Sequence, residues 1–174
     1  MSETYSNRVP ISVNGTPAEA VVSTGSDIPN CWMSFAYFSR IGFKRSNIIQ
    51  VPGVEKVVDF TGNEYTVLGV PDRVFNLEIG DCPMTFNVRP FILQFGHGGY
   101  TFWNDFQITA PNLRDWQIIV RSDGITIGVA NQHSIRFLRP RPNEPLYLAS
   151  LRKGRNFDVN QFRTWLSRNQ VEMR

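Results

Sequence analysis

The sequence predicts an all-β domain followed by a C-terminal α-helix, and three observations support this prediction. Short apolar runs recur along the first 130 residues and are separated by turns rich in Gly, Asn, Asp and Ser. Short strands with such regular turns are typical of a β-barrel or sandwich rather than of alternating α/β units. A proline-rich segment follows near residue 140, and beyond it the apolar residues recur with the period of a helix.

Four pairs of apolar runs predict β-hairpins in the body of the chain. The first pair has the strongest signal, because Asn14-Gly15 is a two-residue turn sequence between alternating strands. The other three pairs also flank short polar turns. In chain order, the paired runs are 9–13 with 18–22, 57–60 with 65–68, 74–79 with 84–93, and 117–120 with 124–128. Residues 35–41 are rich in aromatic side chains and predict a short helix.

A domain boundary is expected near residues 139–145, which contain three prolines in seven residues. Proline-rich sequence is extended rather than packed, so we predict a Pro/Arg-rich linker over 139–155. The β domain then spans residues 8–138, and an amphipathic helix occupies residues 156–174.

The predicted C-terminal helix has one apolar face. Asp158 or Asn156 is expected to cap its N-terminus. An amphipathic helix of this kind needs a cover for its apolar face, either its own β body or a second subunit. The face is formed by Val159, Phe162, Trp165 and Leu166.

Charge is distributed unevenly along the chain. Residues 1–130 hold nine Lys and Arg against twelve Asp and Glu, whereas residues 131–174 hold nine against three. The C-terminal part is therefore basic, and it is either a solvated surface or a binding site for nucleic acid or an acidic partner. The basic residues that we consider for such a site are Arg136, Arg139, Arg141, Arg152, Lys153 and Arg155.

Several classes of protein are excluded by simple features of the sequence. There is no long apolar run for a membrane helix, and the first ten residues do not look like a signal peptide. Cys31 and Cys82 are too few for a disulfide framework or a Cys-rich zinc site, so we expect reduced thiols. No cofactor or metal is predicted. The expected location is the cytoplasm, with the nucleus or a virion as alternatives.

The order of the features resembles the retroviral-type, or retropepsin-like, aspartic protease family over residues 8–130. An apolar strand ends in Ser23-Thr24-Gly25-Ser26-Asp27, where the family has Asp-Thr/Ser-Gly-Ala/Ser. A hairpin with the tip Phe60-Thr61-Gly62-Asn63 follows and resembles the flap of the family. Trp103-Asn104-Asp105-Phe106 resembles the later Gly-x-Asp-Phe segment. The resemblance implies a closed β-barrel and a homodimer with a peptide cleft.

The chain departs from the family pattern at two positions. The catalytic aspartate of the family falls on Ser23, and its glycine before x-Asp-Phe falls on Trp103. In these enzymes two carboxylates, one from each half, share a proton, and a serine hydroxyl does not replace that charge. A serine hydrolase is disfavoured, because the only histidines are His97 and His133 and no Gly-x-Ser-x-Gly elbow surrounds Ser23.

The resemblance also implies roles for the residues that remain. Thr24 matches the hydroxyl that bonds across the dimer axis, and Gly25 and Asp27 match positions that line the peptide cleft. The sequence therefore indicates a catalytically inactive homodimer, viral or retroelement-derived, that acts as a peptide-binding or assembly scaffold. One alternative is an aspartic endopeptidase in inactivated form. Another is a self-assembling viral structural protein that binds nucleic acid through its basic C-terminal segment.

Overall fold

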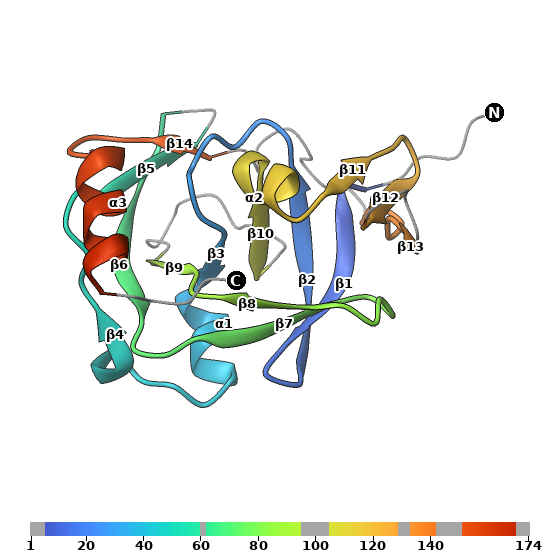
Figure 1. The fold of residues 1–174 in the computed structure, drawn as a ribbon, viewed down its shortest axis with the longest axis horizontal. Coiled ribbons are helices and arrows are strands. Elements are labelled where there is room, and N and C mark those ends of the chain that lie inside the picture. Colours follow the sequence, from blue (N-terminus) through green and yellow to red (C-terminus); the bar gives the residue numbers. More distant parts are fainter. Residues whose placement is uncertain (1–5, 60–61, 95–104, 129–132, 142–150, 170–174) are drawn as a thin grey trace.

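The computed structural model describes residues 6–59, 62–94, 105–128, 133–141 and 151–169, and most of them form β-structure (Figure 1). Eleven strands in these residues make one curled sheet, and three more make a small second sheet. In pairing order the large sheet contains β14 (Leu151–Lys153), β5 (Lys56–Asp59), β6 (Glu64–Pro71), β9 (Phe91–Gln94), β3 (Trp32–Ser34), β10 (Phe106–Thr109), β2 (Thr16–Ser23), β1 (Arg8–Val13), β7 (Phe75–Ile79) and β8 (Thr85–Val88), with β4 (Ile48–Ile49) paired to β6.

The remaining elements of the described residues are a small second sheet, three helices and a 3₁₀ turn. The second sheet consists of β11 (Ile118–Val120), β12 (Gly124–Ile127) and β13 (His133–Arg136), and it lies beside β1 (Figure 1). The helices are α1 (Phe35–Arg40), α2 (Ala110–Asp115) and α3 (Val159–Arg168), with a short 3₁₀ turn, η1 (Arg45–Asn47), before β4. In the described residues the end strands β14 and β8 do not pair with each other, so these residues show a curled half-barrel, and the closed barrel stays a prediction.

The four hairpins predicted from the sequence are confirmed. Asn14 and Gly15 both have positive φ, 50° and 84°, which is the conformation that a two-residue hairpin turn requires. The predicted strand over 84–93 is divided into β8 and β9 by Arg89 and Pro90. Strand β8 pairs with β7, whereas β9 leaves the hairpin and pairs with β3 and β6. Proline has no N–H for a ladder, so a break at this position is physically expected. The short helix predicted over 35–41 is confirmed as α1.

The C-terminal helix packs on its own chain. Phe162 is 1% exposed, and its ring lies 5.0 Å from that of Phe91 in β9. The Asp158 carboxylate accepts hydrogen bonds from the N–H groups of Asn160 and Gln161, so Asp158 rather than Asn156 is the N-cap. Of the two covers considered for the apolar face, the structure shows the β body (Figure 1).

The predicted linker over 139–155 is wrong in part, because Leu151–Lys153 form strand β14. This strand pairs with β5 in antiparallel register, and Leu151 is fully buried. The sequence of the segment gave no local signal for this strand. Its partner strand, β5, lies almost 100 residues earlier in the chain, so no hairpin turn marks the pairing.

Two further sequence predictions concern cysteines and membranes. Cys31 and Cys82 are both buried and free, and burial raises the pKa of the Cys31 thiol. A buried, neutral thiol is chemically inert, which fits a structural role for Cys31. Within the described residues, none of the helices has the length and apolar character needed to cross a membrane.

Candidate functional site

The candidate site lies at the carboxyl ends of two neighbouring parallel strands in the interior of the sheet. Strand β10 pairs with β2 in parallel, and this register sets Thr109 opposite Ser23. Both strands end at these residues, β2 in the turn 24–27 and β10 in α2 (Figure 1). The turn and the helix are joined by a hydrogen bond from the Ala110 N–H to the Ser26 carbonyl, at 3.1 Å. Because parallel strands end on the same side, the residues that follow them meet there.

Ser23 belongs to a buried network of hydroxyl and amide groups. Its Oγ lies 2.9 Å from Ser26 Oγ, and Ser26 Oγ donates to Gln107 Oε1 at 2.6 Å. The backbone N–H of Leu151 donates to the same Ser26 oxygen at 2.9 Å. A hydroxyl has only one proton, and Ser26 gives its proton to Gln107, so Ser23 is the donor in the Ser23–Ser26 contact. Ser23, Ser26 and Gln107 are at most 3% exposed.

The turn itself is accessible, although its anchors are buried. Thr24, Gly25 and Asp27 are exposed, whereas Ser26 is fully buried. A network beneath the turn fixes its backbone and leaves the Thr24 hydroxyl and the Asp27 carboxylate on the surface. The turn is therefore available to a ligand or a second subunit.

The structure identifies neighbours of Ser23 that the sequence analysis missed. Thr109 Oγ1 donates to Asn112 Oδ1 at 2.9 Å, and the Thr109 N–H donates to the same atom at 3.2 Å. The backbone contact is one half of a capping box at the start of α2, where Pro111 occupies the first turn. The signal in the sequence was the alternating run Phe106-Gln107-Ile108, typical of a strand, before Thr109-Ala110-Pro111-Asn112, which is typical of a helix start.

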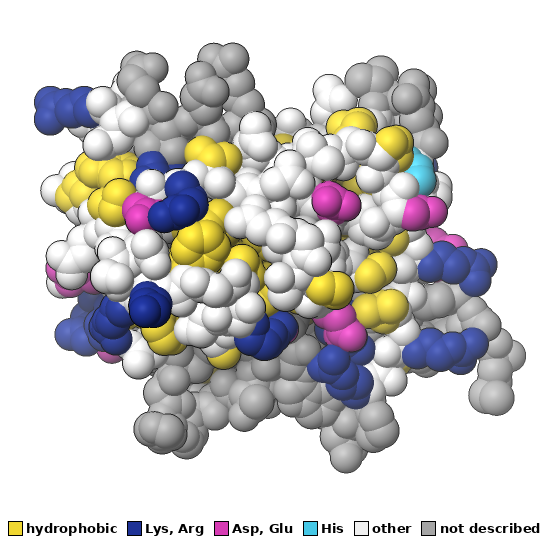
Figure 2. Space-filling model, turned by 90° about the horizontal axis from the view of Figure 1, so that it is seen from below, with side chains coloured by type: hydrophobic (Ala, Val, Ile, Leu, Met, Phe, Trp, Pro, Cys, Tyr) yellow, Lys and Arg dark blue, Asp and Glu magenta, His cyan; other side chains and the backbone are white. Residues whose placement is uncertain are grey.

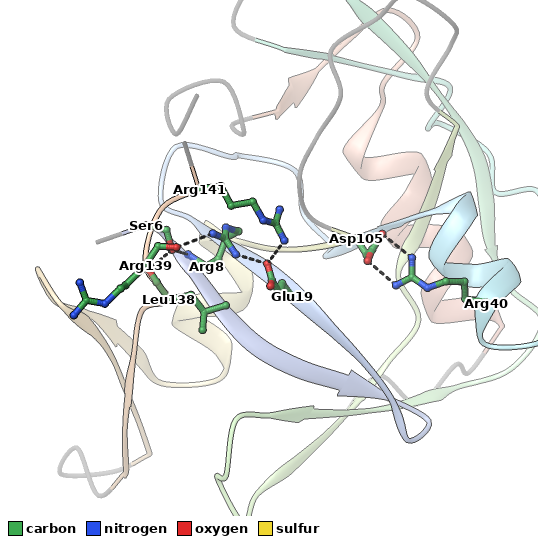
Figure 3. A network of polar contacts seen from close by, with 8 residues as sticks. All are labelled: Ser6, Arg8, Glu19, Arg40, Asp105, Leu138, Arg139 and Arg141. Carbon is green, nitrogen blue, oxygen red and sulfur yellow. Dashed lines mark hydrogen bonds and ion pairs between the residues drawn. The ribbon is translucent and has the colours of Figure 1, made fainter. Parts of the chain in front are cut away.

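The predicted second motif lies at the other end of β10 from Ser23. Asp105 precedes the strand, its N–H donates to the carbonyl of Glu19, and its carboxylate binds the Arg40 guanidinium at 2.6 Å (Figure 3). Phe106 is buried in the core, and Trp103 and Asn104 lie outside the described residues. The parallel register with β2 brings Thr109, rather than Asp105, opposite Ser23.

The flap hairpin, which we define as β5, the turn 60–63 and β6, has a buried acidic residue directly before its turn. Asp59 is 5% exposed and accepts from the Tyr65 hydroxyl at 2.6 Å and from the Asn63 N–H at 3.0 Å. At the tip, Gly62 has a φ of 89° and its N–H donates to the Asp59 carbonyl. Phe60 and Thr61 lie outside the described residues. Asp59 thus orders the turn instead of acting as a free carboxylate.

Strand β14 lies between the flap hairpin and the Ser23 turn. On one edge it pairs with β5, where Leu151 is opposite Asp59. On the other edge its Leu151 N–H reaches Ser26 Oγ. An extended segment of this chain therefore runs between the two parts of the site.

Several residues of the predicted basic site are bound to carboxylates of the β body. Arg141 binds Glu19 at 2.8 Å, and Glu19 also binds the buried guanidinium of Arg8 (Figure 3). Arg155 forms two hydrogen bonds with Glu64, both at 2.9 Å, and they lower the pKa of that carboxyl.

The other basic residues that we considered lie on the surface of the protein. Arg136, Arg139, Arg152 and Lys153 are exposed. On the face shown in Figure 2, Lys and Arg lie in separate groups with acidic side chains among them. The nucleic-acid or acidic-partner role of the basic C-terminal part stays a prediction.

The described residues contain no group of three or more His, Cys, Asp and Glu that could hold a metal ion. His133 Nε2 contacts Asp81 Oδ1 at 2.8 Å on the second sheet, and this contact lowers the pKa of Asp81. His97, the other histidine weighed as a base for Ser23, lies outside the described residues.

Comparison with known proteins supports the fold. No protein-family model matches the chain, and no curated protein sequence matches it. Among solved structures, the retroviral protease-like domain of Ddi1 from Leishmania major superposes with a TM-score of 0.57 at 17% identity. The match covers 82% of this chain and 99% of that domain. At this identity the likeness shows the fold alone, and it confirms a retropepsin-like β fold.

Proposed function

We propose that this protein is a catalytically inactive, homodimeric, retropepsin-like protein that binds extended peptides as a scaffold. The observation that carries the proposal is Ser23, which ends β2 at the motif position of the family's aspartate and donates its proton to Ser26. The accessible turn, the flap hairpin and the retropepsin-like fold support a peptide groove at this place.

The chemistry of Ser23 is unsuited to the protease reaction. An aspartic protease needs two carboxylates that share one proton, so that one activates water while the other donates to the scissile carbonyl. A serine hydroxyl carries no charge near neutral pH. Its neighbours in the network are a hydroxyl and an amide, neither of which is a base. A dimer would hold Ser23 in both halves and would lack both carboxylates.

A turnover assay tests this conclusion. We expect no cleavage of a peptide library near pH 5 by the wild-type protein, because neither half supplies a carboxylate. Ser23→Asp is compared with Ser134→Asp, which places the same charge on an exposed position of β13. Pepstatin-sensitive cleavage by the wild type would contradict the proposal, and cleavage by Ser23→Asp alone would favour the inactivated endopeptidase.

The dimer is proposed from the exposed Thr24, which matches the hydroxyl that bonds across the dimer axis in the family. Thr24→Val keeps the shape of the side chain and removes its hydroxyl from both subunits. We expect the dissociation constant of the dimer to rise at least about tenfold, from the loss of two symmetric hydrogen bonds. Analytical ultracentrifugation measures it, with Thr85→Val on an exposed site of β8 as the control. Equal constants for the two variants would contradict the role of Thr24.

A further inference from the structure

Strand β14 is hydrogen-bonded on both edges, as a peptide ligand would be. The Gly154 N–H donates to the Lys56 carbonyl at 2.9 Å, on the β5 side. The Leu151 N–H points to the opposite side, toward Ser26 Oγ. Because backbone N–H groups alternate along a strand, the Arg152 N–H faces β5 and the Lys153 N–H faces away from it. The segment therefore joins the flap hairpin and the Ser23 turn through its main chain.

The side chain of Leu151 is the apolar anchor of this segment. It is fully buried in a hydrophobic cluster that includes Ile28, which follows the Ser23 turn, and Val57 in β5. Arg152 and Lys153 are exposed. One apolar side chain therefore fills a site under the flap hairpin, and the next two residues are held by their backbone.

The three residues that follow β14 add selectivity to its contact with the flap hairpin. They are Gly154, Arg155 and Asn156. A Cβ atom on Gly154 would lie 2.8 Å from the Lys56 carbonyl oxygen, so a larger residue does not fit without a backbone shift. Arg155 makes its two-hydrogen-bond contact with Glu64 at the start of β6. Asn156 Nδ2 donates to a carboxylate oxygen of Glu55 at 2.9 Å. The β5–β6 side thus recognises glycine followed by a cation.

We propose that the groove between β5 and the Ser23 turn binds extended peptides with the pattern Leu-x-x-Gly-Arg, and that Leu151–Arg155 of this chain occupies it in cis as an autoinhibitory ligand. This inference rests on the proposed peptide-binding function and deepens it by naming the peptide class. Binding of a peptide from another molecule then requires displacement of β14, and the apparent affinity falls with the fraction of molecules whose groove is open.

The test uses the whole 174-residue chain and a fluorescent peptide that covers residues 148–157. Arg152→Pro removes the N–H that faces β5, whereas Lys153→Pro places proline where the N–H faces away. We expect Arg152→Pro to bind the peptide about tenfold more tightly than Lys153→Pro, as measured by fluorescence anisotropy. Peptides with alanine at position 154 or glutamate at position 155 should bind more weakly. Equal binding by the two folded variants would overturn the proposal.

A second pair of variants covers the case in which a proline prevents folding. Arg155→Glu breaks the exposed contact with Glu64, and Arg163→Glu makes the same charge change on the exposed face of α3. We expect about two- to fivefold tighter binding by Arg155→Glu than by Arg163→Glu. No difference would overturn the proposal. A gain in peptide binding by a monomeric protein would instead contradict the proposed homodimer and leave the cis ligand intact.

Discussion

Replacing Phe162 with alanine should lower the free energy of unfolding by about 3–5 kcal/mol. The side chain is 1% exposed and packs on Phe91, so truncation removes apolar burial and leaves a cavity between α3 and the sheet. Urea denaturation followed by tryptophan fluorescence measures the change.

The matched control is Val159→Ala, on the same helix face but only partly buried. We expect it to cost about 1 kcal/mol, within the usual range for a modest truncation. A loss below about 1 kcal/mol for Phe162→Ala would contradict packing of the helix on its own chain.

Gly69→Ala should be the most disruptive single methyl addition in the flap hairpin. Gly69 has a φ of 140°, and a Cβ there would lie 2.1 Å from the Ile49 carbonyl oxygen. Since the contact is with backbone of β4, no side-chain rotation relieves it. We expect a loss of about 3 kcal/mol, from left-handed strain together with overpacking.

Gly42→Ala separates these two contributions to the cost. Gly42 has a φ of 108°, but nothing lies within 4 Å of its Cβ position. Backbone strain alone should therefore lower the free energy of unfolding of Gly42→Ala, by about 1 kcal/mol. Thermal unfolding measures the loss of stability of both variants. Equal losses would contradict the close approach of β4 to Gly69.

The hairpins and the helices α1 and α3 could be predicted because their signals are local. Asn14-Gly15 favours a two-residue turn by its own backbone preferences, and Phe162 and Trp165 follow the helical period. The pairs β2–β10 and β3–β9 are different, because they join segments about 60–90 residues apart in parallel. No turn residue specifies such a pairing, so β3 and β10 were missed.

The candidate site was predictable only in part for the same reason. The turn 23–27 follows a local hairpin and was located correctly in the chain. The residue types of Asn104-Asp105-Phe106 match the second motif of the family. The register of β10 with β2, which no local pattern specifies, places Thr109 beside Ser23. The contact of Leu151 with Ser26 spans 125 residues and involves a backbone N–H, which no residue pattern reveals.

The measurement that tests the central claim most directly is the solution mass by light scattering after size exclusion, with absorbance read at 260 and 280 nm. We predict a dimer, twice the 19.9 kDa chain mass, with the absorbance ratio of pure protein. Two copies supply the two halves of the proposed peptide groove. A strict monomer would contradict the homodimeric scaffold, and a large particle that carries nucleic acid would replace it with the viral structural protein.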